Sequence, residues 1–274
     1  MPRDYSAYKN LIVEVDEDGV ATVTLNRPHV LNAQNYESRL ELNTIWDDLE
    51  LDEDVKVIIF TGAGRGFCAG GDIKEVAERH AKGELSVVEA QTTQPRSNPG
   101  LHYTAKMLNL PKIIIGAING VATGQGCVMA LYCDIVIAAD TASFGDHHIR
   151  VGLVPGDGGT ILWPLLVGPH KTMEYLVTGD LMDAQEADKR GLVNKVVPLA
   201  DLMLTARTLA KRIAHGPTIA IGLTKRAINK KIKQDYNLIM DFALSSEGRT
   251  INTEDHHEAA SAFVEKREPE FKGR

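Results

Sequence analysis

Hydrophobic and polar residues alternate in two short segments near the N-terminus. Apolar side chains recur at every second position in residues 11–15 and 20–25, and a polar Asp-Glu-Asp-Gly turn at residues 16–19 separates the two segments. This pattern predicts a β-hairpin. Residues 35–50 change to helical spacing, which predicts an amphipathic helix. The apolar positions of that helix are Tyr36, Leu40, Leu42, Ile45 and Leu49.

Several later segments are apolar without alternation, as in strands buried on both faces. The first covers residues 55–61, and a helical pattern over residues 73–80 follows it. The further strand candidates are residues 112–119, 134–139 and 193–197. Strands separated by helices predict an α/β fold with a mainly parallel sheet.

From residue 199 onward the pattern is helical only. Apolar stripes cover residues 202–213, 219–232 and 236–246, so we expect a core domain over residues 1–198 and a C-terminal helical region over residues 199–274. The basic run at residues 225–233 is interpreted as a solvated helix face. Two adjacent histidines, His256 and His257, are expected to be exposed.

Composition narrows the class of protein. The 274 residues are 43% hydrophobic and 24% charged, as in an ordinary globular protein, and the net charge of −7 argues against nucleic acid as a partner. No apolar run approaches the roughly 18 residues of a membrane span, and the first residues lack a signal-peptide pattern. Three cysteines without framework spacing predict reduced thiols and a cytoplasmic protein.

Two glycine-rich segments, residues 62–73 and 119–127, each follow an apolar strand. Glycine allows sharp turns and close backbone approach, and a helix start leaves N–H groups free. Phe67 stands where a dinucleotide-binding fingerprint needs its third glycine, so we do not expect a nicotinamide site. The simple alternative is two tight turns. Together, however, the loops could bring two backbone N–H donors to one point, as an oxyanion hole requires.

Residues 143–159, SFGDHHIRVGLVPGDGG, carry the other candidate chemistry. His148 could act as a base near neutral pH, with Asp157 as the carboxylate that orients it. Alternatively, His148 is structural and Asp157 only caps a helix that begins at Gly158. Asp146 is interpreted as a turn residue and His147 as solvent-facing or structural.

The chain resembles the crotonase superfamily, also called the enoyl-CoA hydratase/isomerase family, over nearly its whole length. Each matching segment is weak alone, but their order and spacing together are specific. The segments are Leu25-Asn26-Arg27-Pro28, Asn32-Ala33, residues 67–73, Asn119-Gly120, Cys133-Asp134-Ile135, Phe144-Gly145, residues 152–159, Thr178-Gly179-Asp180, residues 187–197 and residues 262–267.

The resemblance implies a crotonase-like core of repeated ββα units and a C-terminal helical trimerisation region, in a homotrimer or a hexamer built as a dimer of trimers. It implies an acyl-CoA thioester substrate, with CoA as part of the substrate, no other cofactor and no metal. The family stabilises a thioester enolate with two backbone N–H groups, which by position are those of Gly71 and Gln125. Gln125 departs from the glycine that is usual there.

The resemblance also assigns a CoA-binding set. Four of its members lie in the first glycine-rich segment and two near the C-terminus: Ala69, Asp72, Ile73, Lys74, Phe263 and Lys266. The last two match positions that cover the CoA nucleotide, often from a neighbouring subunit. Core packing of a helix would equally explain Phe263, and a solvated charge run would equally explain Lys266.

The catalytic positions depart from the family. Its hydratases use two glutamates, and here those positions are Val128 and His148. His148 nine residues before Asp157 is similar to the β-diketone hydrolase branch, which includes 6-oxocamphor hydrolase. We therefore predict an acyl-CoA enzyme of hydratase or isomerase type in which a His–Asp pair replaces the glutamates. A retro-Claisen C–C hydrolase of a β-diketone or β-ketoacyl-CoA is the alternative, and a scaffold without catalysis is a third class. Glu247 could reach a neighbouring active site.

Overall fold

The computed structural model describes residues 3–75 and 99–274. Its main sheet has six strands in the order β1-β2-β3-β4-β6-β9; β1 and β2 are antiparallel, and the other neighbours are parallel. The strands are β1 (Leu11–Val15), β2 (Val20–Leu25), β3 (Val57–Gly62), β4 (Ile113–Ile118), β6 (Ile135–Ala139) and β9 (Lys195–Val197). The expected hairpin and parallel sheet are therefore confirmed. The helix expected over residues 73–80 is described only as far as residue 75.

A second, three-stranded sheet was not predicted. Its order is β5-β7-β8, with β5 (Val121–Thr123), β7 (Ser143–Gly145) and β8 (Met182–Asp183). Strands of two or three residues are too short for period-two alternation to be visible in a sequence. This small sheet nevertheless carries functional segments, because β5 leads into the second glycine-rich loop and β7 ends just before Asp146.

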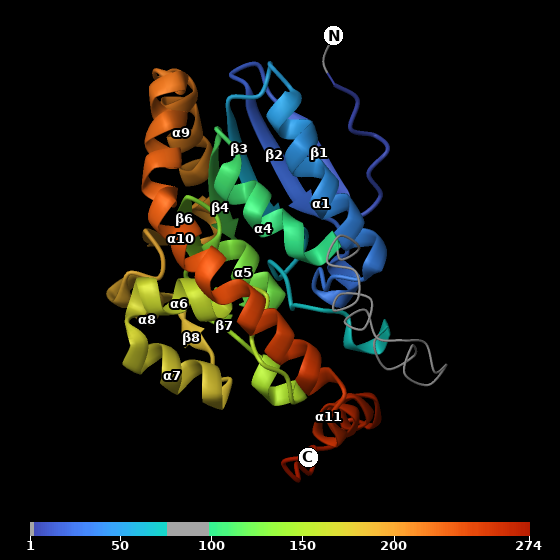
Figure 1. The fold of residues 1–274 in the computed structure, drawn as a ribbon. Helices are drawn as coiled ribbons and strands as arrows, with labels where there is room; N and C mark the ends of the chain where they lie inside the picture. Colours follow the sequence, from blue (N-terminus) through green and yellow to red (C-terminus); the bar gives the residue numbers. More distant parts are fainter. Residues whose placement is uncertain (1–2, 76–98) are drawn as a thin grey trace.

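Helices cover the sheets (Figure 1). They are η1 (Pro28–Val30), α1 (Tyr36–Leu51), α4 (Pro99–Asn109), α5 (Gln125–Leu131), η2 (His148–Val151), α6 (Gly159–Val167), α7 (Pro169–Thr178), α8 (Ala184–Arg190) and η3 (Leu199–Asp201). Helix α1 begins where the Asn35 side chain accepts a hydrogen bond from the Ser38 N–H. Its Trp46 packs edge-to-face on Phe60 of β3, with ring centroids 5.4 Å apart. This contact joins the helix layer to the sheet.

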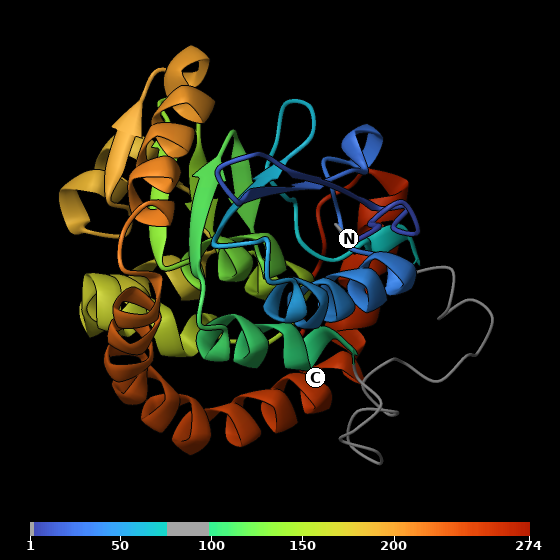
Figure 2. The ribbon, with the colours of Figure 1, turned by 90° about the horizontal axis from the view of Figure 1, so that it is seen from above.

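Helices alone follow residue 199, as expected: α9 (Leu202–Ala214), α10 (Thr218–Ile251) and α11 (Glu254–Glu265). The two stripes expected at 219–232 and 236–246 belong to one continuous 34-residue helix, α10. Figure 2 shows this helix curving along one side of the molecule, past α4. The buried face of α9 shares the core of the sheet; the boundary between residues 198 and 199 stays a prediction. Among the described residues, no helix is both long and apolar enough to cross a membrane.

Two expectations about the C-terminal helices were wrong at one residue each, whereas Arg226, Lys230, Lys231 and His257 are exposed as expected. Lys225 is not on a solvated face: its side chain is 1% exposed, and its Nζ lies 2.7 Å from Asp134 Oδ2 and 3.0 Å from the Lys112 carbonyl oxygen. His256 is buried, and its Nδ1 lies 2.6 Å from the Val151 carbonyl oxygen. Both contacts link residues distant in sequence, so local charge patterns could not reveal them. Lys225 anchors α10 to the sheet, and His256 anchors α11 to η2.

Replacing Lys225 by Ala is expected to lower the free energy of unfolding by about 3 kcal/mol, because it leaves the Asp134 carboxylate buried without its counter-ion. Chemical denaturation measures the change. Lys231→Ala, on the same helix with a 65% exposed side chain, is the control and should change stability by less than about 0.5 kcal/mol. Equal effects of the two substitutions would show that the buried pair does not anchor α10.

Candidate active site

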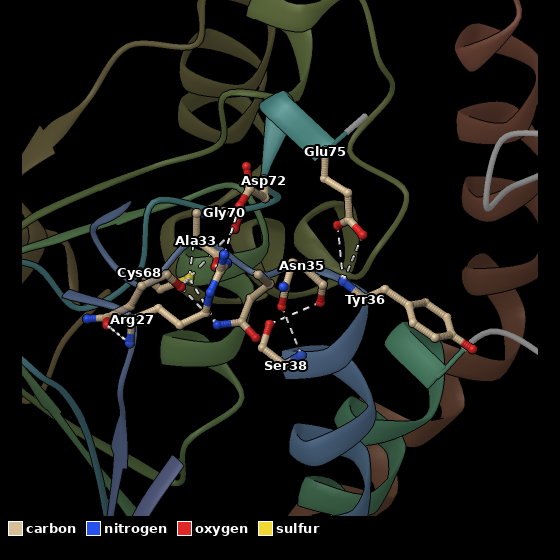
Figure 3. A network of polar contacts seen from close by, with 11 residues as sticks. Arg27, Ala33, Asn35, Tyr36, Ser38, Cys68, Gly70, Asp72 and Glu75 are labelled. Carbon is tan, nitrogen blue, oxygen red and sulfur yellow. Dashed lines mark hydrogen bonds and ion pairs between the residues drawn. The ribbon is translucent and has the colours of Figure 1, made fainter. Parts of the chain in front are cut away.

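The first glycine-rich loop leaves one backbone N–H unused. Gly70 has φ +96°, a conformation that favours glycine, and its carbonyl oxygen accepts from the Gln34 N–H at 2.7 Å. The Asp72 N–H donates to the Gln34 carbonyl oxygen at 3.1 Å. Gly71 lies between these two bonds, and within the described residues its N–H donates to no acceptor. Figure 3 shows Gly70 in this polar network.

The second glycine-rich loop lies beside the first and also has one backbone N–H without an acceptor among the described residues. Gln125 is the first residue of α5, so its N–H has no partner inside the helix. Thr123 N–H bonds the Cys68 carbonyl oxygen at 3.0 Å, which joins the two loops. A Cβ built on Gly70 would lie only 3.8 Å from the Gln125 nitrogen. The structure thus brings the two sequence-predicted segments together, each with a free N–H group in the described part of the chain.

His148 faces these loops, since its Cε1 lies 3.7 Å from where a Cβ on Gly124 would be. Its hydrogen-bond partner is Asp146: Nδ1 lies 2.5 Å from Asp146 Oδ1. Its Nε2 lies 3.8 Å from Asp157 Oδ2, beyond hydrogen-bond distance. The expectation that Asp157 orients the ring is therefore wrong in detail. Asp146 does accept from the His148 N–H at 3.2 Å, as a turn residue does, but it is fully buried and also holds the ring.

Charges in this cluster determine which groups hold protons. Burial alone would lower the pKa of His148, but the carboxylates of Asp146 and Asp157 outweigh burial and hold that pKa well above its usual range. Burial opposes ionisation of Asp146, and His148 nevertheless holds the pKa of Asp146 below its usual value. Burial raises the pKa of Asp157 to about 6. The imidazole is therefore charged near neutral pH, and Asp157 is the better base.

The spacing of Asp146, His148 and Asp157 also suits a cation, because one possible ligand atom from each lies within 4.8 Å of the others. Yet Nδ1 of His148 and Oδ1 of Asp146 are only 2.5 Å apart. Two ligand atoms bound to the same metal ion at about 2.0–2.2 Å each would lie farther apart than this. We interpret this pair as sharing a proton. The prediction that the protein has no metal is left untested.

Asp157 does not cap the next helix. Helix α6 begins at Gly159, its N-cap is Gly158, and no side-chain cap bond is formed. One carboxylate oxygen of Asp157, Oδ1, is buried without a hydrogen-bond partner in the described structure. The capping alternative for Asp157 is therefore wrong, and the carboxylate is available for another contact.

Sequence reasoning did not name Arg39, and it gave Glu247 only as a residue that could reach a neighbouring active site. Arg39 on α1 places Nη2 3.0 Å from where a Cβ on Gly71 would be, and its Nε is buried without a described partner. Glu247 on α10 packs directly against Gly156, beside Asp157. Each belongs to a helix whose sequence spacing carries no sign of the active site. Three-dimensional packing places both residues at the site of this chain itself.

The CoA-binding candidates fall into two groups. Asp72 forms an ion pair with Arg27 at 3.1 Å, and this pair is seen in Figure 3. Ala69 is half-buried in the loop, and the half-buried Ile73 and the exposed Lys74 begin the helix that follows it. Phe263, 52% exposed, and Lys266 lie instead at the end of α11, which packs against η2. Core packing therefore does not account for Phe263, and a role in covering CoA stays a prediction for both residues.

Known proteins share the sequence pattern and the fold of this chain. The family model described as enoyl-CoA hydratase/isomerase matches residues 16–274. The chain belongs to this family. It is 38% identical to the short-chain-enoyl-CoA hydratase of Clostridium acetobutylicum, over 97% of this chain and 98% of that protein. It is 36% identical to the 1,2-epoxyphenylacetyl-CoA isomerase of Escherichia coli, over 94% and 97%.

The same family appears among solved structures. An enoyl-CoA hydratase/isomerase from Mycobacterium paratuberculosis superposes with a TM-score of 0.85 at 33% identity, covering 94% of this chain and 99% of that one. The predicted crotonase-like fold with a helical C-terminal region is confirmed. The similarity to the β-diketone hydrolase branch is not confirmed, because the family members above are hydratases and isomerases. Val128, which the resemblance places at a family glutamate position, is fully buried in α5.

The Asp146→Asn substitution is expected to lower the pKa of His148, because it removes the carboxylate nearest the ring. Proton and nitrogen NMR of the imidazole measures this titration. Asp180→Asn, which removes an exposed acid paired with Arg150, is the control and should leave the titration unchanged. The same titration in Asp146→Asn and the parent would contradict the prediction.

The same pair affects stability with a defined sign. A folded-state pKa above the unfolded value of about 6.5 means that protonated His148 stabilises the fold fully below that pH. This contribution is lost as pH rises through the folded-state pKa. Asp146→Asn should reduce the contribution.

Proposed function

We propose that this chain is an acyl-CoA enzyme that stabilises a thioester enolate with the N–H groups of Gly71 and Gln125. The observation that carries the proposal is the pair of free N–H groups, on adjoining loops, beside His148 and Asp157. A thioester oxygen that gains negative charge needs donors fixed in advance. The Gln125 N–H also lies at a helix start, where partial positive charge favours an anion.

Acid–base work in this proposal belongs to His148 and Asp157. Asp157 is ionised above about pH 6 and can accept a proton. In hydration, a water oxygen bonds the β-carbon while Asp157 takes the water proton, and the electron pair moves to the thioester oxygen. In isomerisation, Asp157 removes a proton from the acyl chain, and a proton returns at another carbon. The charged His148, fixed by Asp146, stabilises the ionised Asp157 in both cases.

Substrate binding rests on the family. The hydratase and isomerase relatives are named for CoA thioesters, and we propose an acyl-CoA here, with CoA part of the substrate and no other cofactor. Ala69, Asp72, Ile73 and Lys74 would line one side of the CoA, and Phe263 with Lys266 would cover the nucleotide. A C–C hydrolase is not favoured, because these relatives catalyse other reactions. The acidic charge gives no support to a nucleic-acid partner.

We also propose a homotrimer or a hexamer in the cytoplasm. The outer face of α10 carries large apolar side chains that are 59–81% exposed, and exposed apolar patches commonly mark interfaces. These are Ile219, Leu223, Ile228, Leu238 and Phe242. The three cysteines are buried as free thiols, which agrees with a reducing compartment.

The test is turnover of a thioester panel containing 2-enoyl-CoA, 3-enoyl-CoA and β-ketoacyl-CoA, followed by mass spectrometry. We expect water addition to, or isomerisation of, an enoyl-CoA. Asp157→Asn should lower kcat by about 10²–10⁴-fold, the usual size of an acid–base contribution, with CoA binding retained. His148→Gln should also lower kcat, because it removes the charge that keeps Asp157 ionised.

Two controls sharpen this test. Asp183→Asn removes the carboxylate that caps α8. It should leave turnover unchanged and lower stability slightly. A chelator should leave turnover unchanged, since the proposed chemistry uses no metal. Absence of turnover on the whole panel, together with absence of CoA binding, would overturn the proposed function.

A further inference from the structure

The proposed reaction leaves one proton unassigned. Hydration needs a group that removes a proton from water and a group that delivers a proton to the α-carbon. Asp157 serves as the first group, and His148 is fixed by Asp146. Val128 holds the position of a family glutamate but has no proton to exchange and is fully buried. A second carboxyl group has to come from another element.

Helix α10 brings such a group to the same place. The side chain of Glu247 packs against Gly156, so that a Cβ built on Gly156 would lie 2.4 Å from Glu247 Oε2 and 2.6 Å from its Cβ. Only glycine leaves space for this contact. Gly156 immediately precedes Asp157, so Glu247 packs on the backbone next to Asp157.

Four charged groups on other elements act electrostatically on Glu247. They are His148 at the start of η2, Asp157 before α6, Asp146 after β7 and Arg39 on α1. Two of these are cations and two are acids. Burial raises the pKa of Glu247 to about 7, the two acids add to this effect, and His148 with Arg39 oppose it. Two nearby carboxyl groups rarely ionise together, so one of them tends to keep a proton.

We propose that Glu247 is the second acid/base residue of the active site. Asp157 and Glu247 together take the roles of the two family glutamates, whose positions are Val128 and His148 in this chain. The proposal rests on the proposed function. It assigns this site to an enoyl-CoA substrate that gains or relocates a proton at the α-carbon. It also makes α10, rather than the second glycine-rich loop, the source of the second carboxyl group.

The proton balance of hydration closes with these two residues. A water oxygen bonds the β-carbon, and its proton passes to the Asp157 carboxylate. The carbon–carbon π electrons move to the thioester oxygen, which the Gly71 and Gln125 N–H groups hold. When the enolate collapses, the α-carbon takes the proton of the Glu247 carboxyl group. Asp157 is then protonated and Glu247 ionised, and transfer of the proton from Asp157 to Glu247 restores the starting state without any further reactant.

The experiment compares the parent with Glu247→Gln, which keeps the size of the side chain but removes its acid. With the enoyl-CoA that the parent converts, kcat should fall about 100-fold or more while KM stays similar. The pH profile carries the specific signal. If the reaction requires protonated Glu247, the parent loses activity as pH rises through about 7. This alkaline limb of the pH profile should be absent in the variant. Glu247→Asp should recover part of the activity.

Asp241→Asn, an exposed acid on the same helix, is the matched control and should behave as the parent. CoA binding and thermal unfolding verify that each variant is folded. A Glu247→Gln variant with the parent's kcat and the same alkaline limb, while Asp157→Asn is inactive, would overturn the role of Glu247 alone. A parent that converts no thioester would instead overturn the proposed function.

Discussion

The close approach of two backbone loops is the constraint on which the site depends. A Cβ on Gly126 would lie 2.1 Å from the Cys68 carbonyl oxygen, and one on Gly120 would lie 2.3 Å from that of Arg65. No side chain fits at either position, so glycine is required for the loops to meet. Their meeting brings together two N–H groups that have no acceptor in the described part of the chain, beside the largely buried ring of His148. The strands β3 and β5 hold the loops in this register.

Charge around His148 is the second constraint. A neutral imidazole would be the expected base at this position, but three carboxyl groups surround the ring, and they favour the cation. The ring therefore acts as a fixed positive charge, while acid–base exchange moves to the carboxyl groups. The Arg39 guanidinium adds positive charge beside Gly71. The positive charges of His148 and Arg39 thus offset much of the negative charge of the carboxylates, and the proposed chemistry uses no metal.

How much the sequence predicted depends on the range of the interaction. The hairpin, the parallel strands and the two glycine-rich loops follow from local patterns, and the family resemblance correctly led to the fold. His148 and Asp146 are only two residues apart, yet the pattern suggested a turn, because the sequence does not show that Asp146 is fully buried. Arg39 and Glu247 lie 109 residues before and 99 residues after His148 in the 274-residue sequence. Spacing rules carry no information over such separations.

Helix α10 is anchored at one end by the Lys225–Asp134 pair and contributes Ala243 and Glu247 at the other, where they pack on Gly156. Ribosomes synthesise this helix after both glycine-rich loops. The residues of the sheet and of the two loops are therefore synthesised before the α10 residues that pack next to Asp157. The pocket is complete only once nearly the entire polypeptide has emerged, so the growing chain cannot acquire its full set of charged groups early.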